Sequence, residues 1–396
     1  MGLTMQEKKK IARITSERYI HSSKSQRSVI IDEFVATTGY NRSYATYVLR
    51  YAYIKSTKPL PKKEKLHRPK RVIYDRFVAS ALLKIWPIMD YICGRRLAAA
   101  MPDVLDNLTR NGFLKTSVVT HDKLLKISPS SIERILKHAR KDLKIKGKSF
   151  TKPGTLLKKQ IPVRTFDDWN ENSPGFVEMD LVAHCGGNAS GDFINSLNFT
   201  DINTAWTETV AVQNKAQSNV FKGIILARSR LPFPLKGIDS DNGNEFINYH
   251  LLKYCQDEKI TFTRSRAYRK NDNCFIEQKN YSVVRRFAGY ARYDTAEELR
   301  LLNLLYTASR LYLNFFTPSA KLIFKQRIGS KVIKKYDKPL TPFKRVLASP
   351  DVTDSVKACL TDQFASLNLV SLFKTIRSTQ KALLKFGYQK NKLLNK

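Results

Sequence analysis

The sequence predicts an α/β domain built on a mixed sheet and set between two basic, largely helical flanks. Short apolar runs of strand length begin near residue 174, where the hydrophobic period changes from helical to strand-like. From there the expected order of elements is β-β-β-α-β-α-β-α, which places helices on both faces of a five-stranded sheet. Charge divides the chain in the same way. Residues 171–290 hold 14 basic and 13 acidic side chains, whereas both flanks are strongly basic.

Each element of this domain is expected from a local pattern. The run FVEMDLV at 176–182 is typical of a buried strand, and two more strands are expected around a turn at 201–204. The full set of expected elements comprises strands at 176–182, 193–200, 206–212, 235–238 and 261–263, and helices at 214–229, 245–257 and 273–290.

The flanks have a coarser pattern. Residues 24–54 and 75–142 are mostly helical, and residues 295–313 continue the helical pattern beyond the sheet domain. The C-terminal region is expected to be extended, basic and Pro-punctuated over 317–350, with amphipathic helices at 353–366 and 369–386. The expected domains are 1–56 (helix-turn-helix), 57–72 (basic linker), 73–145 (second helical region), 146–171 (basic linker), 172–316 (catalytic core) and 317–396 (basic C-terminal region).

Net charge indicates the kind of partner. The 396 residues include 70 Lys and Arg against 34 Asp and Glu, a formal charge of +36. Such an excess is expected beside a polyanion, where basic side chains displace the counterions of phosphates. The five scattered cysteines contain no C-x-x-C pair, which favours a reducing compartment. With no signal pattern and no apolar run of spanning length, the expected location is the cytoplasm, with nucleoid association on DNA.

Two segments resemble helix-turn-helix units. In the first, residues 24–54, Asn41 is the expected N-cap of a second helix whose Arg42, Ser43 and Tyr47 would face a DNA groove. In the second, residues 119–142, Ser130 and Glu133 have the spacing of a capping box. Arg134, Lys137 and Lys141 would there face outward. An ordinary helical hairpin remains the alternative for residues 24–54.

Three acidic residues fall at positions where α/β sheets build their sites. Asp180 lies in the first strand, Asp241 directly follows the fourth, and Glu277 opens the last long helix. Three carboxylates can hold two Mg²⁺ ions, which stabilise both the attacking and the leaving oxygen of a phosphodiester. Asp180 is the expected bridging ligand. Asp239 is the alternative to Asp241, because it lies two residues earlier on the same strand.

The spacing of these residues resembles a known signature. Asp180, Asp241 and then 35 intervening residues before Glu277 match the D,D-35-E pattern of retroviral integrases and bacterial insertion-sequence transposases. Three sequence segments strengthen the resemblance, which covers roughly residues 172–320. They are SDNGNEF around Asp241, FTRSRAYRKND at 262–272 and IEQKN at 276–280. The chain is thus similar to the integrase-core transposases.

That resemblance implies an RNase H-like core that cleaves DNA and transfers strands with two Mg²⁺ ions, or Mn²⁺ in their place. It also implies DNA ends and target DNA as partners, and a homo-multimer on DNA. Zinc is not implied, because the His-His-Cys-Cys module of retroviral relatives is missing, and His184-Cys185 is expected to pack beside the first strand. The expected phosphate contacts near the site are Arg269, Lys270, Lys279 and Arg285.

Two other functions remain open at this point. A nuclease of the same fold would cut DNA without joining it. A sequence-specific DNA-binding protein with an inactive core would bind DNA without metal-dependent chemistry. The complete set of three acidic residues favours the enzyme.

Overall fold

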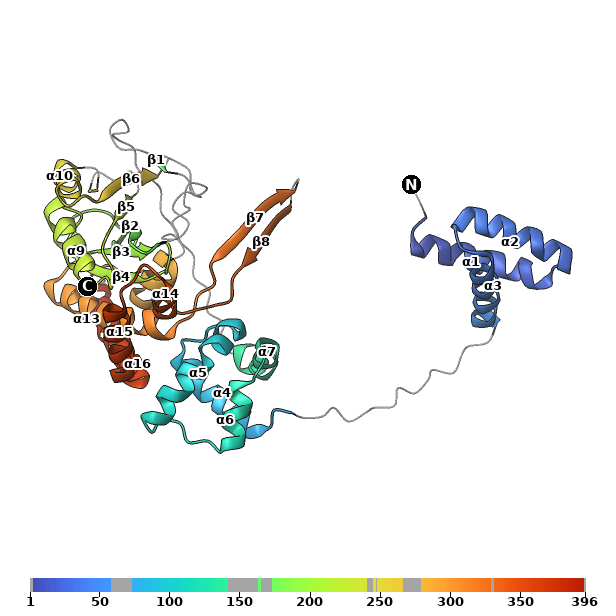
Figure 1. The fold of residues 1–396 in the computed structure, drawn as a ribbon, viewed down its shortest axis with the longest axis horizontal. Helices are drawn as coiled ribbons and strands as arrows, with labels where there is room; N and C mark the ends of the chain where they lie inside the picture. The colour runs from blue at the N-terminus through green and yellow to red at the C-terminus, as the bar shows by residue number, and fades with distance from the viewer. Residues whose placement is uncertain are drawn as a thin grey trace. The chain divides into compact units, whose positions relative to one another are not determined.

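The computed structural model describes residues 3–57, 73–141, 163–164, 173–240, 245–246, 248–265, 279–328 and 331–394 (Figure 1). The chain divides into two compact units, Met1–Val72 and Ile73–Lys396. The described part of the first, residues 3–57, forms helices, whereas the second combines a sheet with helices.

The first unit contains three helices, α1 (Met5–His21), α2 (Lys24–Thr38) and α3 (Arg42–Thr57). The expected pair at 24–54 corresponds to α2 and α3, and α1 was not expected. Gly39 ends α2 in the left-handed conformation, at φ 69°, which glycine adopts without strain. Asn41 caps α3 as predicted, since its Oδ1 accepts a hydrogen bond of 2.7 Å from the Tyr44 N–H.

The second helical region contains α4 (Arg76–Ile88), α5 (Gly94–Arg110), α6 (Val118–Leu125), α7 (Pro129–Ile135) and α8 (Lys137–Lys141). The predicted capping box at Ser130 and Glu133 is wrong. Ser128 caps α7 instead, because Pro129 is suited to the first helical position. Glu133 accepts a 2.5 Å hydrogen bond from the Gly94 N–H and pairs with Arg140.

The sheet has the predicted mixed architecture. Its strands are β1 (Val163–Arg164), β2 (Phe176–Ala183), β3 (Asn195–Asp201), β4 (Thr207–Val212), β5 (Gly237–Ser240) and β6 (Thr261–Ser265). Their order is β1-β6-β5-β2-β3-β4. The β2–β3–β4 pairs are antiparallel, and β5 and β6 run parallel to β2. This is the expected five-stranded RNase H-like sheet, extended by the two-residue β1.

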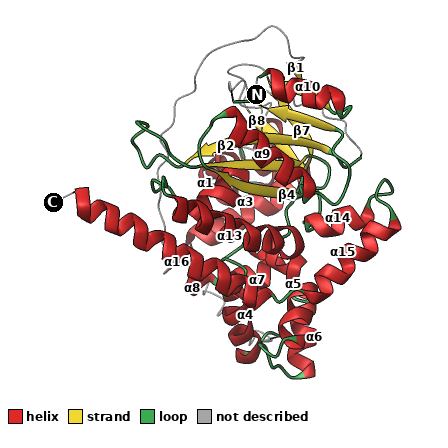
Figure 2. Ribbon diagram, turned by 90° about the vertical axis from the view of Figure 1, so that its left-hand side faces the viewer, coloured by secondary structure: helices red, strands yellow, loops and turns green. Residues whose placement is uncertain are grey.

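Helices cover both faces of this sheet (Figure 2). On one face, α9 (Gln217–Ser229) and α10 (Tyr249–Asp257) pack on apolar side chains such as Val177 and Met179. The other face carries polar side chains and meets the π-helical turn η2 (Asn280–Arg285), α12 (Arg286–Ala288) and α13 (Ala296–Leu311). On this second face, the Ser196 and Tyr306 hydroxyls are hydrogen-bonded at 2.6 Å.

After α13 the chain forms η3 (Tyr312–Phe316), a hairpin of β7 (Leu322–Ile328) and β8 (Lys331–Tyr336), and the helices α14 (Pro342–Ala348), α15 (Asp354–Ser366) and α16 (Leu369–Leu394). The two expected C-terminal helices are confirmed, and α16 runs beyond residue 386. The hairpin and α14 occupy the segment that was expected to be merely extended.

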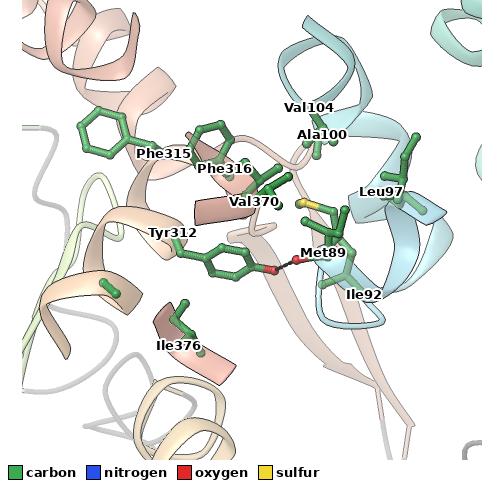
Figure 3. Close-up of a cluster of buried hydrophobic side chains, with 14 of the residues drawn as sticks. Met89, Ile92, Leu97, Ala100, Val104, Tyr312, Phe315, Phe316, Val370 and Ile376 are labelled. Carbon is green, nitrogen blue, oxygen red and sulfur yellow. Dashed lines mark hydrogen bonds between the residues drawn. The ribbon is translucent and has the colours of Figure 1, made fainter. Parts of the chain in front are cut away.

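One hydrophobic cluster joins the second helical region, the sheet domain and the C-terminal helices (Figure 3). Met89 and Val104 meet Phe316 of η3 and Val370 of α16 there. Tyr312 Oη donates a 2.9 Å hydrogen bond to the Ile88 carbonyl at the same place. Three segments that the sequence treats as separate domains therefore share a core. None of the described helices is long and apolar enough to span a membrane.

Side-chain amides from α13 and η3 form hydrogen bonds to the backbone of the edge strand β4. Asn314 Oδ1 accepts from the Thr207 N–H at 3.0 Å, and its Nδ2 donates to the Thr207 carbonyl at 2.9 Å. Asn303 makes the same pair of bonds to Ala211, at 3.0 and 3.1 Å. These amides satisfy backbone groups that a free edge would expose to another chain.

Asn314→Ala should destabilise the second unit by about 2–4 kcal/mol, since it leaves two buried backbone groups of Thr207 without partners. Urea denaturation followed by tryptophan fluorescence measures this change. Thr307→Ala, on the exposed side of α13, serves as the control and should change stability by less than about 0.5 kcal/mol. Equal losses in both variants would contradict the role of Asn314 as an edge cap.

Candidate active site

Asp180 lies near the middle of the polar face of the sheet. Strand register places it directly opposite Asn198 of β3, which in turn is opposite Thr209 of β4. Side chains alternate between the faces of a strand, so the register partners Asp180, Asn198 and Thr209 form one row across three strands. The row lies on the face that η2 covers.

A chain of hydrogen bonds orients the Asp180 carboxylate. The Leu181 N–H donates to Asp180 Oδ1 at 2.8 Å, and Asn280 Nδ2 donates to Oδ2 at 2.6 Å. Asn280 Oδ1 accepts from Asn198 Nδ2 at 3.0 Å, and Asn198 Oδ1 accepts from the Thr209 hydroxyl at 3.4 Å. A carboxylate has about four lone-pair sites on its two oxygens, so this type of side chain can accept hydrogen bonds and bind a cation.

The adjacent row of the same face is buried. It runs through Thr263, Asp239, Glu178, Thr200 and Thr207, in register across five strands. Asp239 is only 1% exposed and accepts a 2.6 Å hydrogen bond from the Thr263 hydroxyl. This places Asp239 inside the domain, away from a large substrate.

The other two predicted carboxylates, Asp241 and Glu277, lie outside the described residues, as do Arg269 and Lys270. Described residues end before Asp241 at Ser240, the register partner of Met179, and begin again after Glu277 at Lys279, next to Asn280. Over the described ranges, no group of three His, Cys, Asp or Glu side chains is arranged to hold a metal ion.

Two of the expected phosphate contacts are engaged within the protein. Lys279 Nζ donates to the Ala205 carbonyl at 3.2 Å, and burial, with the nearby Arg96 and Arg345, lowers the pKa of Lys279 to about 7. Arg285 donates to the Ala183 carbonyl at 2.9 Å and lies over the Tyr290 ring. Both side chains therefore hold the helix after Glu277 against the sheet.

The remaining expected DNA contacts lie on helices. In α3, Arg42, Ser43 and Tyr47 are all exposed, and Arg42 forms a surface ion pair with Asp32 of α2. Tyr47 belongs to a row of exposed tyrosines, with ring centroids 6.2 Å from Tyr44 and 5.8 Å from Tyr51. In the second helical region Arg134 and Lys137 are exposed, and Lys141 ends α8.

His184 packs beside the sheet, as the sequence predicted. Its Nε2 shares a 2.7 Å hydrogen bond with the Ser196 hydroxyl, and its ring contacts Tyr293. Burial, followed by the charge of Arg285, lowers the pKa of His184 to about 3. The imidazole is therefore neutral at physiological pH.

This lowered pKa predicts a loss of stability in acid. The unfolded chain takes up a proton near pH 6.5, whereas the folded protein does so only near pH 3, so stability falls as pH decreases between these values. Moving from pH 7.5 to 5.5 should cost about 1.4 kcal/mol through His184 alone. His184→Gln should show a pH dependence of urea denaturation that is smaller by this amount. An identical dependence in both proteins would contradict the assignment.

Asn280 and Asn198 are the site residues on which Asp180 depends. Helical spacing from Glu277 points to Asn280, because residues three apart share a face. Asn198 has a weaker signal: asparagine is uncommon inside strands, so one within the run SLNFT suggests a specific hydrogen bond.

Strand order and helix placement give this chain an RNase H-like core. Among solved structures, the chain is similar to the magnesium complex of the HTLV-2 integrase catalytic core in its dimeric form. That match has 14% identity and TM-score 0.28, and covers 37% of this chain and 90% of that one. The catalytic core of BIV integrase gives 16% identity and TM-score 0.29, covering 43% and 91%.

A relative in sequence is much nearer. The uncharacterized protein y4rM of Sinorhizobium fredii is 39% identical over 345 residues, which cover 87% of this chain and 96% of that protein. The chain belongs to the family of y4rM. No family model matches it.

Proposed function

We propose that this protein is a transposase or integrase that cleaves DNA and transfers its strands, with Asp180, Asp241 and Glu277 as the catalytic carboxylates. The observation that carries the proposal is the 2.6 Å hydrogen bond from Asn280 to Asp180. It holds the helix that follows Glu277 against the strand that carries Asp180.

Chain connectivity supports the other two positions. Asp241 follows Ser240, whose register partner is Met179, the residue before Asp180. Glu277 precedes Asn280 by three residues, the spacing at which helical side chains share a face.

The donor set fits a magnesium site. Carboxylate oxygens are the ligands that Mg²⁺ prefers, and the Asp180 carboxylate is oriented by an amide donor and a backbone donor. Asp180, Asp241 and Glu277 would hold two Mg²⁺ ions, which would offset charge on the attacking and leaving oxygens. Asn280 and Asn198 fix the direction of the Asp180 carboxylate, and Lys279 and Arg285 fix the helix.

The proposed reaction has two displacements at phosphorus. Water attacks a phosphodiester at the end of the element and the P–O3′ bond breaks, which yields a 5′-phosphate and a free 3′-hydroxyl. That hydroxyl then attacks a phosphodiester of target DNA and releases a target 3′-hydroxyl. Neither step needs a covalent protein–DNA intermediate, and two DNA ends must be held together, which favours a homo-multimer.

DNA is the partner that the charge supports. Basic flanks surround a nearly balanced core, and the net charge is +36. In the first unit, α3 presents Ser43 and Tyr47 beside the other exposed tyrosines, and would enter a DNA groove. Because the proposed partner is DNA, we expect the protein to act in the cytoplasm, at the nucleoid.

The test is an assay of the purified chain with labelled duplexes that carry the sequences flanking its own gene, in Mg²⁺ or in EDTA. Cleaved and joined products are separated on denaturing gels. We expect both products only with Mg²⁺, and neither from Asp241→Asn or Glu277→Gln. Asp257→Asn, on the exposed surface of α10, makes the same change away from the site and should retain activity.

Each rival function has its own outcome in this assay. Cleavage without a joined product would support a nuclease. Tight binding with no cleavage under Mg²⁺ or Mn²⁺ would support a DNA-binding protein whose core is inactive, and would overturn the proposal.

A further inference from the structure

The β7–β8 hairpin is a basic ribbon on which none of the described elements of the chain packs as a cover. In Figure 1 it extends away from α14 and the body of the second unit. Residues 321–336 include six Lys or Arg and no acidic residue. Ile323 and Ile328 are 66% and 58% exposed, and Phe324 and Tyr336 are also exposed. A strand pair that packed on its own domain would bury such side chains.

The base of the ribbon is rigidly held. The Lys321 N–H donates to Asp337 Oδ1 at 2.6 Å, and the Asp337 N–H donates back to the Lys321 carbonyl at 3.0 Å. Arg345 forms a 2.8 Å ion pair with Asp337, and Arg95 donates to the Asp337 carbonyl at 2.8 Å. The stem is thus fixed to α5 and α14, while the side chains of Ile323 and Ile328 in β7, and of Lys334 and Lys335 in β8, are exposed.

The stem also lies close to the proposed active site. Lys321 Nζ donates to the Asn203 carbonyl at 2.5 Å, and Lys279 Nζ donates to the Ala205 carbonyl of the same β3–β4 turn at 3.2 Å. Lys279 is two residues from Glu277. A DNA duplex that reaches the site would therefore pass near the base of the ribbon.

We infer that the β7–β8 ribbon inserts into the major groove of the duplex on which the site acts. A seven-residue strand is about 23 Å long, and a groove about 12 Å wide admits a two-stranded ribbon. Lysines meet phosphates at the groove walls, and the exposed isoleucines contact base edges. The bulge between Leu322 and Phe324 adds twist at the stem. The inference rests on the proposed function only in taking duplex DNA as the substrate.

A second copy of the chain is a poorer occupant. Each strand of the ribbon has a free edge, to which another ribbon can pair. Such pairing would bring two segments of six positive charges side by side without any acidic residue between them. A polyanion relieves this repulsion, whereas another copy increases it.

The test measures binding of the full chain to a labelled 30-base-pair duplex in EDTA, over a series of salt concentrations. Lys334→Ala/Lys335→Ala should reduce the slope of log affinity against log salt by up to about 1.8, as expected for two lost phosphate contacts. Lys334→Arg/Lys335→Arg should retain the slope. Lys222→Ala/Lys253→Ala, on α9 and α10, makes the same charge change elsewhere and should retain it too.

Dimethyl sulfate footprinting identifies the groove, because guanine N7 lies in the major groove and adenine N3 in the minor groove. We expect guanine protection by the wild type that the alanine variant loses. An unchanged slope and footprint, loss of adenine protection alone, or an altered oligomeric state with unchanged binding would each overturn the inference. Groove protection without cleavage in Mg²⁺ would leave it standing while the proposed catalytic function fails.

Discussion

Asp180→Asn should lower the rate of DNA strand cleavage by at least about 10³-fold, because the several kcal/mol that bound metal contributes to the transition state depend on this carboxylate. The amide that replaces it is nearly the same size and can still accept from the Leu181 N–H, but its NH₂ group then faces the Asn280 Nδ2 donor and that hydrogen bond is lost. DNA affinity in EDTA should be unchanged, and the free energy of unfolding should fall by only about 1 kcal/mol. Single-turnover cleavage of labelled DNA, with binding and thermal melting measured in parallel, separates these quantities.

Asp239→Asn is the matched control for this prediction. Both substitutions convert an aspartate on the polar face of the sheet to an amide, but Asp239 is buried and bonded to Thr263. Its variant can lose stability yet should keep cleavage within about tenfold of the wild type, since Asp239 lies outside the proposed metal ligands. A cleavage defect larger in Asp239→Asn than in Asp180→Asn would exchange their assigned roles.

The mixed sheet was predictable because its strands are short apolar runs separated by clear turns, and helices between the later strands supply the connections that a parallel pair requires. The spacing of Asp180, Asp241 and Glu277 then indicated which strands carry the candidate active site. Which helices pack against one another was harder to predict. The amphipathic pattern of 75–142 shows that a face is buried, but it does not show that α5 packs against η3 and α16.

The features that the sequence analysis predicted wrongly or did not predict have physical causes in particular residues. At α7, Ser130 has the capping-box spacing, yet the proline after Ser128 makes Ser128 the better cap. At β7–β8, lysine is common although it is poorly represented in strands, so composition predicts an extended segment and not a hairpin. The bonds from Asn303 and Asn314 to strand β4 join residues about a hundred positions apart, which no local pattern reveals.

Arg310→Met should destabilise the second unit by about 3–5 kcal/mol, because it leaves a buried carboxylate without its counter-charge. Glu208 is fully buried on β4, and its Oε2 accepts from Arg310 Nε at 2.5 Å, while Oε1 accepts from Trp206 Nε1 at 2.8 Å. Burial raises the pKa of Glu208, and Arg310 opposes that rise. Urea denaturation of both proteins at pH 7.5 measures the loss.

Three comparisons make this prediction specific to the ion pair. Arg300→Met, on the same helix but in an exposed pair with Glu297, should cost less than about 1 kcal/mol. Glu208→Gln/Arg310→Met removes the charge but keeps an acceptor for Trp206, so it should recover most of the lost stability. The deficit of Arg310→Met should also shrink as pH falls, because a carboxyl with a raised folded-state pKa binds its proton more tightly in the folded protein. A deficit that is independent of pH and is not rescued by the double variant would show that Arg310 acts through packing and not through charge.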